Sequence, residues 1–276
     1  MPEPYPFPDE FSPVGSTVFY AIRFAPSDRH ADLSLVNAFY RTVKSIPFTC
    51  SDPGVAAEKL NWWQLEMQRS RQSQAQHPIA RSMGTLQIRH NLPEDYFTPF
   101  FQAVGQEIGS IVVENDVDLE VHCRHTGGLF ADLNAVVGNC NDAQRSAARE
   151  LGEYLRMVEI LRDLGKDLRQ NRCFIPRDRL KRHQLSPTQL LDSDSGERLN
   201  ELLSSLGSFQ QQRYRKTLQE ISLRDGLGPV LGMAAMAERV LRIIHADGYR
   251  RLLRQRTSLT PLHKLWISWR CQRRIG

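Results

Sequence analysis

The chain has 276 residues, of which 41% are hydrophobic and 24% are charged, so it can bury a core as one large domain or two small ones. Its net charge of +5 and its isoelectric point near 9.1 favour anionic partners, such as phosphorylated metabolites, acidic lipid or nucleic acid. Five scattered cysteines without a CxxC pair argue against a disulfide framework, and no apolar run reaches the roughly 18 residues that span a bilayer.

The N-terminal sequence MPEPYPFPDEFSP, residues 1–13, is acidic and rich in proline, which predicts an extended arm rather than a signal peptide. Over residues 14–276 apolar residues recur at helical spacing, alternating β patterns are scarce, and no linker separates two domains. We therefore predict one all-α domain. Helices are expected over residues 31–43, 54–72, 77–90, 95–112, 118–138, 142–168 and 228–253, with two more within 186–221.

Several single residues refine these helices. Pro47 should end the first one, because proline cannot donate the backbone hydrogen bond that a helix interior needs. Asp142 is expected to cap the longest helix through its carboxylate. The glycine pair at 127–128 would let another helix approach closely. His122 and His125 lie nearby, but zinc would need further ligands at matching spacing, so structural roles are favoured for both.

The sequence ILRDLGKDLRQNRCFIP, residues 160–176, continues a row of acids along one helix face. Glu159, Asp163 and Asp167 follow at i, i+4 and i+8, so their carboxylates point the same way and repel one another unless cations intervene. One interpretation is a surface helix with many ion pairs. The other is a site for Mg²⁺ and a phosphorylated ligand. The cations available nearby in the sequence are Arg162, Lys166, Arg169 and Arg172.

The C-terminal part of the chain contains no acidic residue after Asp247. An apolar stripe at helical spacing runs along this basic segment: Leu262, Leu265, Trp266 and Trp269. Such a stripe is typical of a helix that lies on a membrane surface, and it would equally suit a last helix packed on the core. We expect a cytoplasmic protein, with peripheral contact to the inner face of the membrane through residues 250–276 as one alternative. No motif supports binding to nucleic acid.

These segments, in this order, resemble the squalene/phytoene synthase family, especially its bacterial branch, over about residues 14–270. The resemblance rests on five segments, which read GSTVFYAIRFAP, LNWWQLEM, HPIARSM, ILRDLGKDLRQNRCFIP and IIHADGYRRLLRQRTSLTPLHKLW. It implies an isoprenoid synthase fold, which is a single bundle of helices around a central apolar cavity. Family enzymes condense two farnesyl or geranylgeranyl diphosphates head to head, and two aspartate-rich helices hold Mg²⁺ against the diphosphates.

The second aspartate-rich motif of the family is kept. Its RDxxxD pattern matches Arg162, Asp163 and Asp167, and its later arginine matches Arg172, while Glu159 replaces the usual asparagine. The resemblance therefore implies that Asp163, Asp167 and Glu159 are the metal ligands for Mg²⁺. It also implies a set of residues that bind the substrate diphosphate: Arg41, Lys44, Arg162, Arg172, Arg256 and Tyr20.

The first aspartate-rich motif has degenerated. Where the family reads like AFCRxxDDxxD, this chain reads AFYRTVKSIPF, and Lys44, Ser45 and Phe48 occupy the three aspartate positions. This exchange removes the oxygen ligands that one side of the metal cluster requires. In a bundle of this type Lys44 would face the acid stripe, where it could pair with Asp163 or Asp167, or hold a diphosphate as a point charge.

Three functions remain open on these grounds. The first is a protein with lost or strongly altered catalysis that binds an isoprenoid diphosphate or a protein partner. The second is an active, Mg²⁺-dependent head-to-head prenyltransferase that uses the second motif and Lys44. The third is a membrane-associated scaffold whose cavity is only structural. No residue is assigned a catalytic role from the sequence.

Overall fold

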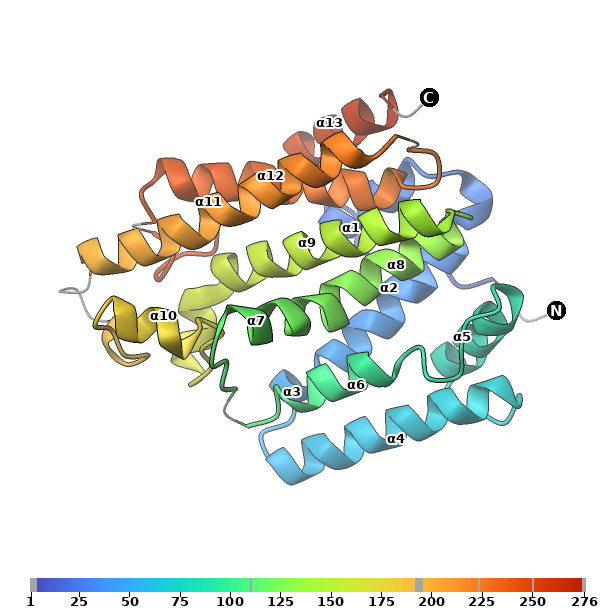
Figure 1. Cartoon of the computed structure of the whole chain (residues 1–276). Coiled ribbons are helices and arrows are strands. Elements are labelled where there is room, and N and C mark those ends of the chain that lie inside the picture. The colour runs from blue at the N-terminus through green and yellow to red at the C-terminus, as the bar shows by residue number, and fades with distance from the viewer. Residues whose placement is uncertain (1–3, 110, 192–195, 223, 250, 275–276) are drawn as a thin grey trace.

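The computed structural model describes residues 4–109, 111–191, 196–222, 224–249 and 251–274. Every regular element within these ranges is helical, and they contain no strand (Figure 1). The predicted all-α class is therefore confirmed. Within the same ranges, no helix combines the length and the apolar content needed to cross a bilayer.

The elements follow one another with short connections. The first half of the chain forms α1 (Thr17–Arg23), η1 (Ser27–Arg29), α2 (His30–Lys44), α3 (Ile46–Thr49), α4 (Pro53–Arg71), α5 (Pro78–Arg89) and α6 (Thr98–Gly105). The second half forms α7 (Asp116–Cys123), the π turn η2 (Arg124–Gly128), α8 (Leu129–Val137), α9 (Asp142–Arg169), α10 (Arg177–Arg182), η3 (Gln189–Leu191), α11 (Gly196–Glu220), α12 (Gly228–Ala246) and α13 (Pro261–Gln272).

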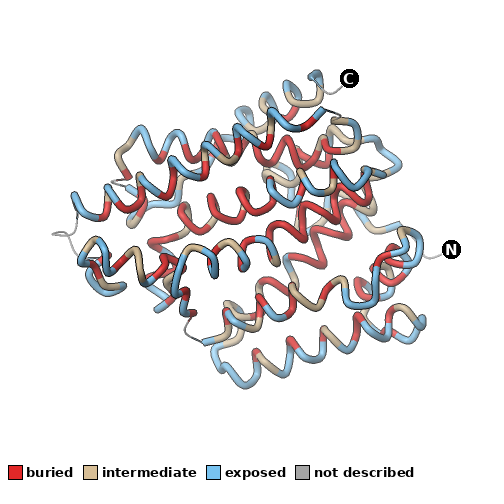
Figure 2. The backbone as a smooth tube through the Cα atoms, viewed as in Figure 1, coloured by how far each residue is buried: buried red, intermediate tan, exposed pale blue. Residues whose placement is uncertain are grey.

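The long helix α9 runs through the middle of the bundle and packs against η2, α8, α11 and α12. In Figure 1, α11, α12 and α13 lie on one side of it and α4, α5 and α6 on the other. The burial colours of Figure 2 follow this arrangement, because the central helices are mostly red and the outer faces of the peripheral ones are blue. The helix that carries the second motif is therefore the central one of the bundle.

Two glycines allow α9 to approach the π turn closely. A Cβ atom added at Gly127 would lie 2.3 Å from the carbonyl oxygen of Gly152, and one added at Gly152 would lie 2.1 Å from that of Gly127. No larger residue fits at either position without moving a backbone. The expected close approach at 127–128 is thus confirmed, and it brings α9 against the helical segment that carries His122.

Pro47 ends α2 as expected, because the helix stops at Lys44 and the proline lies in the first turn of the short helix α3. The predicted cap of α9 was wrong by one residue. The side chain of Asn141 accepts the N–H of Gln144, and the side chain of Gln144 accepts the N–H of Asn141, which forms a reciprocal capping box. Asp142 is instead the first residue inside the helix.

Three other helix boundaries differ from the prediction. The helix expected over 95–112 is confined to α6, which ends at Gly105 and leaves Glu107 in a turn. The helix expected over 228–253 ends at Ala246, because Gly248 and Tyr249 adopt positive φ angles. The segment 186–221 contains the short turn η3 and one long helix, α11, while residues 192–195 lie outside the described ranges.

The described part of the proline-rich N-terminal segment lies on the bundle. The ring of Phe7 stacks on Phe19, with 5.5 Å between their centroids, and Asn37 donates a hydrogen bond to the carbonyl oxygen of Phe11. Phe11 also lines the main cavity, so this segment contributes to the wall of the pocket. The division into an arm over 1–13 and a domain over 14–276 stays a prediction.

Candidate functional site

The main cavity has a volume of about 270 Å³ and opens between α2, α9, α12 and the segment before α13. Part of its lining is apolar and comes from Tyr40, Phe130, Met233, Met236 and Val240. The expected combination of a helical bundle and a partly apolar cavity is therefore present. Such a concave, largely apolar site with a few charged groups is the usual form of a small-molecule pocket.

The charged residues that line this cavity are mostly cations. They are Arg41, Arg156, Arg162, Arg256 and Lys264, and the lining contains one carboxylate, that of Glu159. Arg256 is well exposed, with 63% of its side chain accessible, so it lies where a ligand would meet it from solvent. This end of the cavity is suited to an anion.

Behind this cavity lies a second charged group, the Glu107 cluster, which comprises Glu107, Lys44, His122, Arg156 and Arg172. Glu107 is fully buried, and one oxygen of its carboxylate accepts a hydrogen bond from Lys44 and a longer one of 3.3 Å from Arg156. The other oxygen accepts from Arg172 at 2.7 Å. His122 places its Nε2 atom 3.0 Å from the carboxylate. Lys44 therefore pairs with Glu107, and the expected pairing with Asp163 or Asp167 does not occur.

The cluster carries more positive than negative charge. Burial acts to raise the pKa of the Glu107 carboxyl, but the charges of Lys44 and Arg156 outweigh it and hold that pKa well below its usual range. Burial and the nearby charge of Arg156 lower the pKa of Lys44 to about 8, against the opposing effect of Glu107. Burial also lowers the pKa of His122, so its ring is neutral at pH 7. Three cations thus share one carboxylate.

Two residues at the aspartate positions of the family's first motif are part of this cluster or contact it, namely Lys44 and Phe48. The guanidinium of Arg172 lies 3.8 Å from the ring centroid of Phe48, and the ammonium of Lys44 lies 5.3 Å from it. These are cation–π contacts, which are strongest where water is excluded. The hydroxyl of Ser45 donates to the carbonyl oxygen of Thr42, one turn earlier in α2. This wall presents no carboxylate from the motif.

On α9, Asp163 is held by two arginines that line the cavity. Arg162 donates two hydrogen bonds to it, of 3.0 and 2.8 Å, and Arg256 donates two more, of 2.7 and 3.4 Å. Burial acts to raise the pKa of the Asp163 carboxyl, but the hydrogen bonds and charges of both arginines outweigh it and lower that pKa to about 2. Asp163 is therefore an ionised anchor whose lone pairs are already used.

The other two acids of the stripe differ from Asp163. Asp167 is buried, and burial raises the pKa of its carboxyl, which weakens it as a ligand for a hard cation. Glu159 is nearly half exposed and lies 3.5 Å from Arg156. In the described ranges of the chain, no group of three or more His, Cys, Asp or Glu side chains is arranged to hold a metal. The Mg²⁺ site at the second motif therefore stays a prediction, and Asp163 could join it only by exchanging its arginine partners.

The structure separates the predicted site residues into groups. Arg41, Glu159, Arg162 and Arg256 line the cavity. Lys44 and Arg172 bind Glu107 instead, and Asp163 and Asp167 are not part of the lining. Tyr20 packs against Phe19 and does not line the cavity either.

Sequence reasoning missed Glu107, Arg156 and Lys264. Glu107 stood inside a predicted helix, so nothing in the sequence marked it as a buried counter-ion. Arg156 lies three residues before Glu159 on α9 and could have been found by extending the analysis of the acid stripe by one turn. Lys264 belongs to the basic C-terminal segment, for which no pocket role was expected, yet its side chain lines the cavity.

Comparison with known proteins supports the same assignment from sequence and from fold. The sequence profile of squalene/phytoene synthases matches residues 11–263. The phytoene synthase of Thermus thermophilus is 21% identical over 73% of this chain and 70% of its own length, and that of Mycobacterium tuberculosis is 26% identical over 64% and 60%. A ligand-bound dehydrosqualene synthase, 16% identical, superposes with a TM-score of 0.80 over 94% of this chain and 91% of its own.

The arginine clamp on Asp163 predicts a specific loss of stability in acid. Because the carboxyl titrates near 3.8 in the unfolded chain and near 2 in the folded one, the unfolded state takes up the proton first as the pH falls. Asp163 alone should therefore remove about 1 kcal/mol of unfolding free energy between pH 5 and pH 3. Urea denaturation at both pH values measures it, and Asp163→Asn should show a correspondingly smaller difference. An unchanged difference in that variant would contradict the clamp.

Proposed function

The chain belongs to the squalene/phytoene synthase family, and we propose that it binds an isoprenoid diphosphate while the condensation chemistry of the family is lost or strongly altered. The observation that carries this proposal is the cavity, whose apolar walls end in a group of cations. A prenyl chain would lie against Phe130, Met233 and Met236, where burial of apolar surface is favourable. The diphosphate would lie at the charged end, near Arg41 and Arg256.

The loss of chemistry is inferred from the two walls of the site. Ionisation of an allylic diphosphate develops negative charge on the leaving group, and bridging metal ions stabilise that charge. Here the first motif offers Lys44 and Phe48, and α9 offers an Asp163 that is already bound by arginines. These side chains leave few oxygen ligands for such a metal cluster, since Glu159 is the one carboxylate in the described lining of the cavity. Binding by cations survives this change better than turnover does.

The size of the cavity favours one ligand over two. A volume of about 270 Å³ lies just below the range of about 300–1,000 Å³ that is usual for small-molecule sites. A head-to-head condensation must hold two prenyl chains at once. Farnesyl and geranylgeranyl diphosphate both remain candidates for the single ligand, since the relatives include synthases named for phytoene and for dehydrosqualene.

Incubation of the purified chain with radiolabelled farnesyl or geranylgeranyl diphosphate separates binding from turnover. We expect equilibrium dialysis to retain one of the two labels, and extraction after incubation with Mg²⁺ to give no squalene- or phytoene-type product. A phytoene synthase assayed in parallel controls for the substrate and the extraction. Product formation by this chain would contradict the proposal and support the active prenyltransferase. Failure to retain either label would instead leave a protein partner or a scaffold as the role of the fold.

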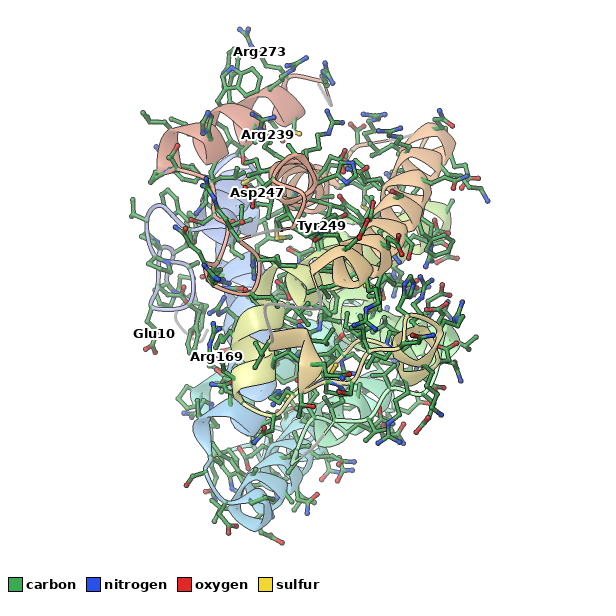
Figure 3. The ribbon with its side chains drawn as sticks, turned by 90° about the vertical axis from the view of Figure 1, so that its left-hand side faces the viewer. Glu10, Arg169, Arg239, Asp247, Tyr249 and Arg273 are labelled. Carbon is green, nitrogen blue, oxygen red and sulfur yellow. The ribbon has the colours of Figure 1, made fainter. Side chains whose placement is uncertain are left out.

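We further propose that α13 contacts an anionic membrane surface. Its stripe is exposed, with 77% of Leu262, 52% of Trp266 and 42% of Trp269 accessible, and Leu265 is exposed as well. The helix packs on α12 and α1, and Ser268 is its buried residue, so the stripe points away from the bundle. Figure 3 shows Arg273 projecting outward beyond α13. Residues 250, 275 and 276 of the predicted contact segment lie outside the described ranges.

Two arginines lie on the indole rings of this stripe. The guanidinium of Arg270 is 5.2 Å from the ring of Trp266, and that of Arg273 is 4.4 Å from the ring of Trp269. Tryptophan side chains favour the headgroup level of a bilayer, and each basic residue near an acidic surface adds about 1 kcal/mol. The exposed stripe and its arginines thus support membrane contact over the alternative in which the stripe closes the core.

Co-sedimentation with liposomes tests this contact. The chain should bind vesicles that contain acidic lipid, bind less in high salt, and lose most binding in the double variant Trp266→Ala/Trp269→Ala. Trp62→Ala is a matched control, because Trp62 is an exposed tryptophan on α4, on the opposite side of the bundle (Figure 1). Vesicle binding that needs no acidic lipid, or that the control variant reduces equally, would contradict the proposal.

A further inference from the structure

The structure assigns to the charged end of the cavity a diphosphate subsite that works without a metal ion, with Arg41, Arg256 and Lys264 in contact with the ligand. This inference rests on the proposed binding of an isoprenoid diphosphate and specifies how the anion is held. Arginine and lysine side chains neutralise the charge of the diphosphate in place of the expected Mg²⁺.

The first support is a group of positively charged side chains at the cavity that has few carboxylates beside it. Arg41 lines the cavity, and its guanidinium makes no hydrogen bond or ion pair with any residue in the described ranges. Lys264 comes from α13 and donates a hydrogen bond to the carbonyl oxygen of Gly15, which leaves two of its three protons for other acceptors. Burial lowers the pKa of Lys264, and the positive charges of Arg256 and Arg162 lower it further. An anion bound among these groups would relieve their mutual repulsion.

The second support is the changed role of Asp163. It receives four hydrogen bonds from Arg162 and Arg256, which come from α9 and from the loop 93 residues further along the chain. This carboxylate therefore fixes two guanidinium groups next to each other at the cavity. Arginine forks of this kind match the geometry of phosphate oxygens. Asp163 is a positioning residue here, and a metal ion would have to displace both arginines to use it.

The third support is the Glu107 cluster behind the cavity. Lys44, Arg156 and Arg172 together carry three positive charges around Glu107, and Glu159 is a second carboxylate, 3.5 Å from Arg156. Arg156 belongs both to this cluster and to the cavity lining, so the excess charge extends to the subsite. A diphosphate would be attracted by this charge.

The experiment titrates the full chain with inorganic pyrophosphate and with the non-hydrolysable farnesyl S-thiolodiphosphate, in excess EDTA and then in Mg²⁺, by calorimetry. We expect both probes to bind in EDTA, and Mg²⁺ to change neither affinity by more than about twofold. Arg256→Ala and Lys264→Met should each weaken binding in EDTA about tenfold, as expected for the loss of a charged hydrogen bond. Arg251→Ala is the matched control, because Arg251 is exposed and pairs with Asp247.

The outcomes separate this inference from the proposed function. Binding of the farnesyl probe only in Mg²⁺ would overturn the metal-free subsite and leave the proposed function standing. Binding in EDTA that Arg256→Ala and Lys264→Met leave unchanged would overturn the assignment of these residues. If farnesol binds as tightly as the farnesyl probe, the farnesyl group occupies the cavity but no diphosphate subsite exists. Absence of binding under both conditions would overturn the inference and the proposed function together.

Discussion

A carboxylate without access to water has to be neutralised, and Glu107 imposes this requirement on the centre of the bundle. The fold meets it with side chains from three separate places, since Lys44 ends α2, Arg156 lies in the middle of α9, and Arg172 follows that helix. The close contact between Gly127 and Gly152 holds α9 against the π turn next to this cluster. The ion cluster thus joins α2, α9 and the segment after α9 next to the cavity.

This requirement also decides the chemistry at the cavity. Because Lys44 is committed to Glu107, the wall that carried aspartates in the first motif is closed by an ion pair and by the ring of Phe48. On α9, Asp163 accepts hydrogen bonds from two arginines and holds them in place. Both changes act in the same direction, since each removes oxygen ligands and leaves positive charge. We propose that the result is a site that favours anions over divalent cations.

The sequence was sufficient for the helices, for the family and for the loss of the first motif, because these depend on local spacing and on the order of segments. It could not supply the partner of Lys44. The apolar pattern of 95–112 continues past Gly105, so Glu107 looked like a helix surface residue, and only the tertiary fold buries it. The Asp163–Arg256 contact joins residues 93 positions apart, and neither spacing nor charge predicts which of many arginines is used.

A double-mutant cycle on Lys44→Met and Glu107→Gln, followed by chemical denaturation, tests most directly whether this ion pair organises the site. Removing Glu107 alone strands buried cations and should cost about 3–5 kcal/mol of unfolding free energy. If Lys44 is its counter-ion, the double variant should lose less than the sum of the two single losses, with a coupling energy of about 1–3 kcal/mol. Single losses that add to within about 0.5 kcal/mol would show that Lys44 and Glu107 are independent, which would contradict the account.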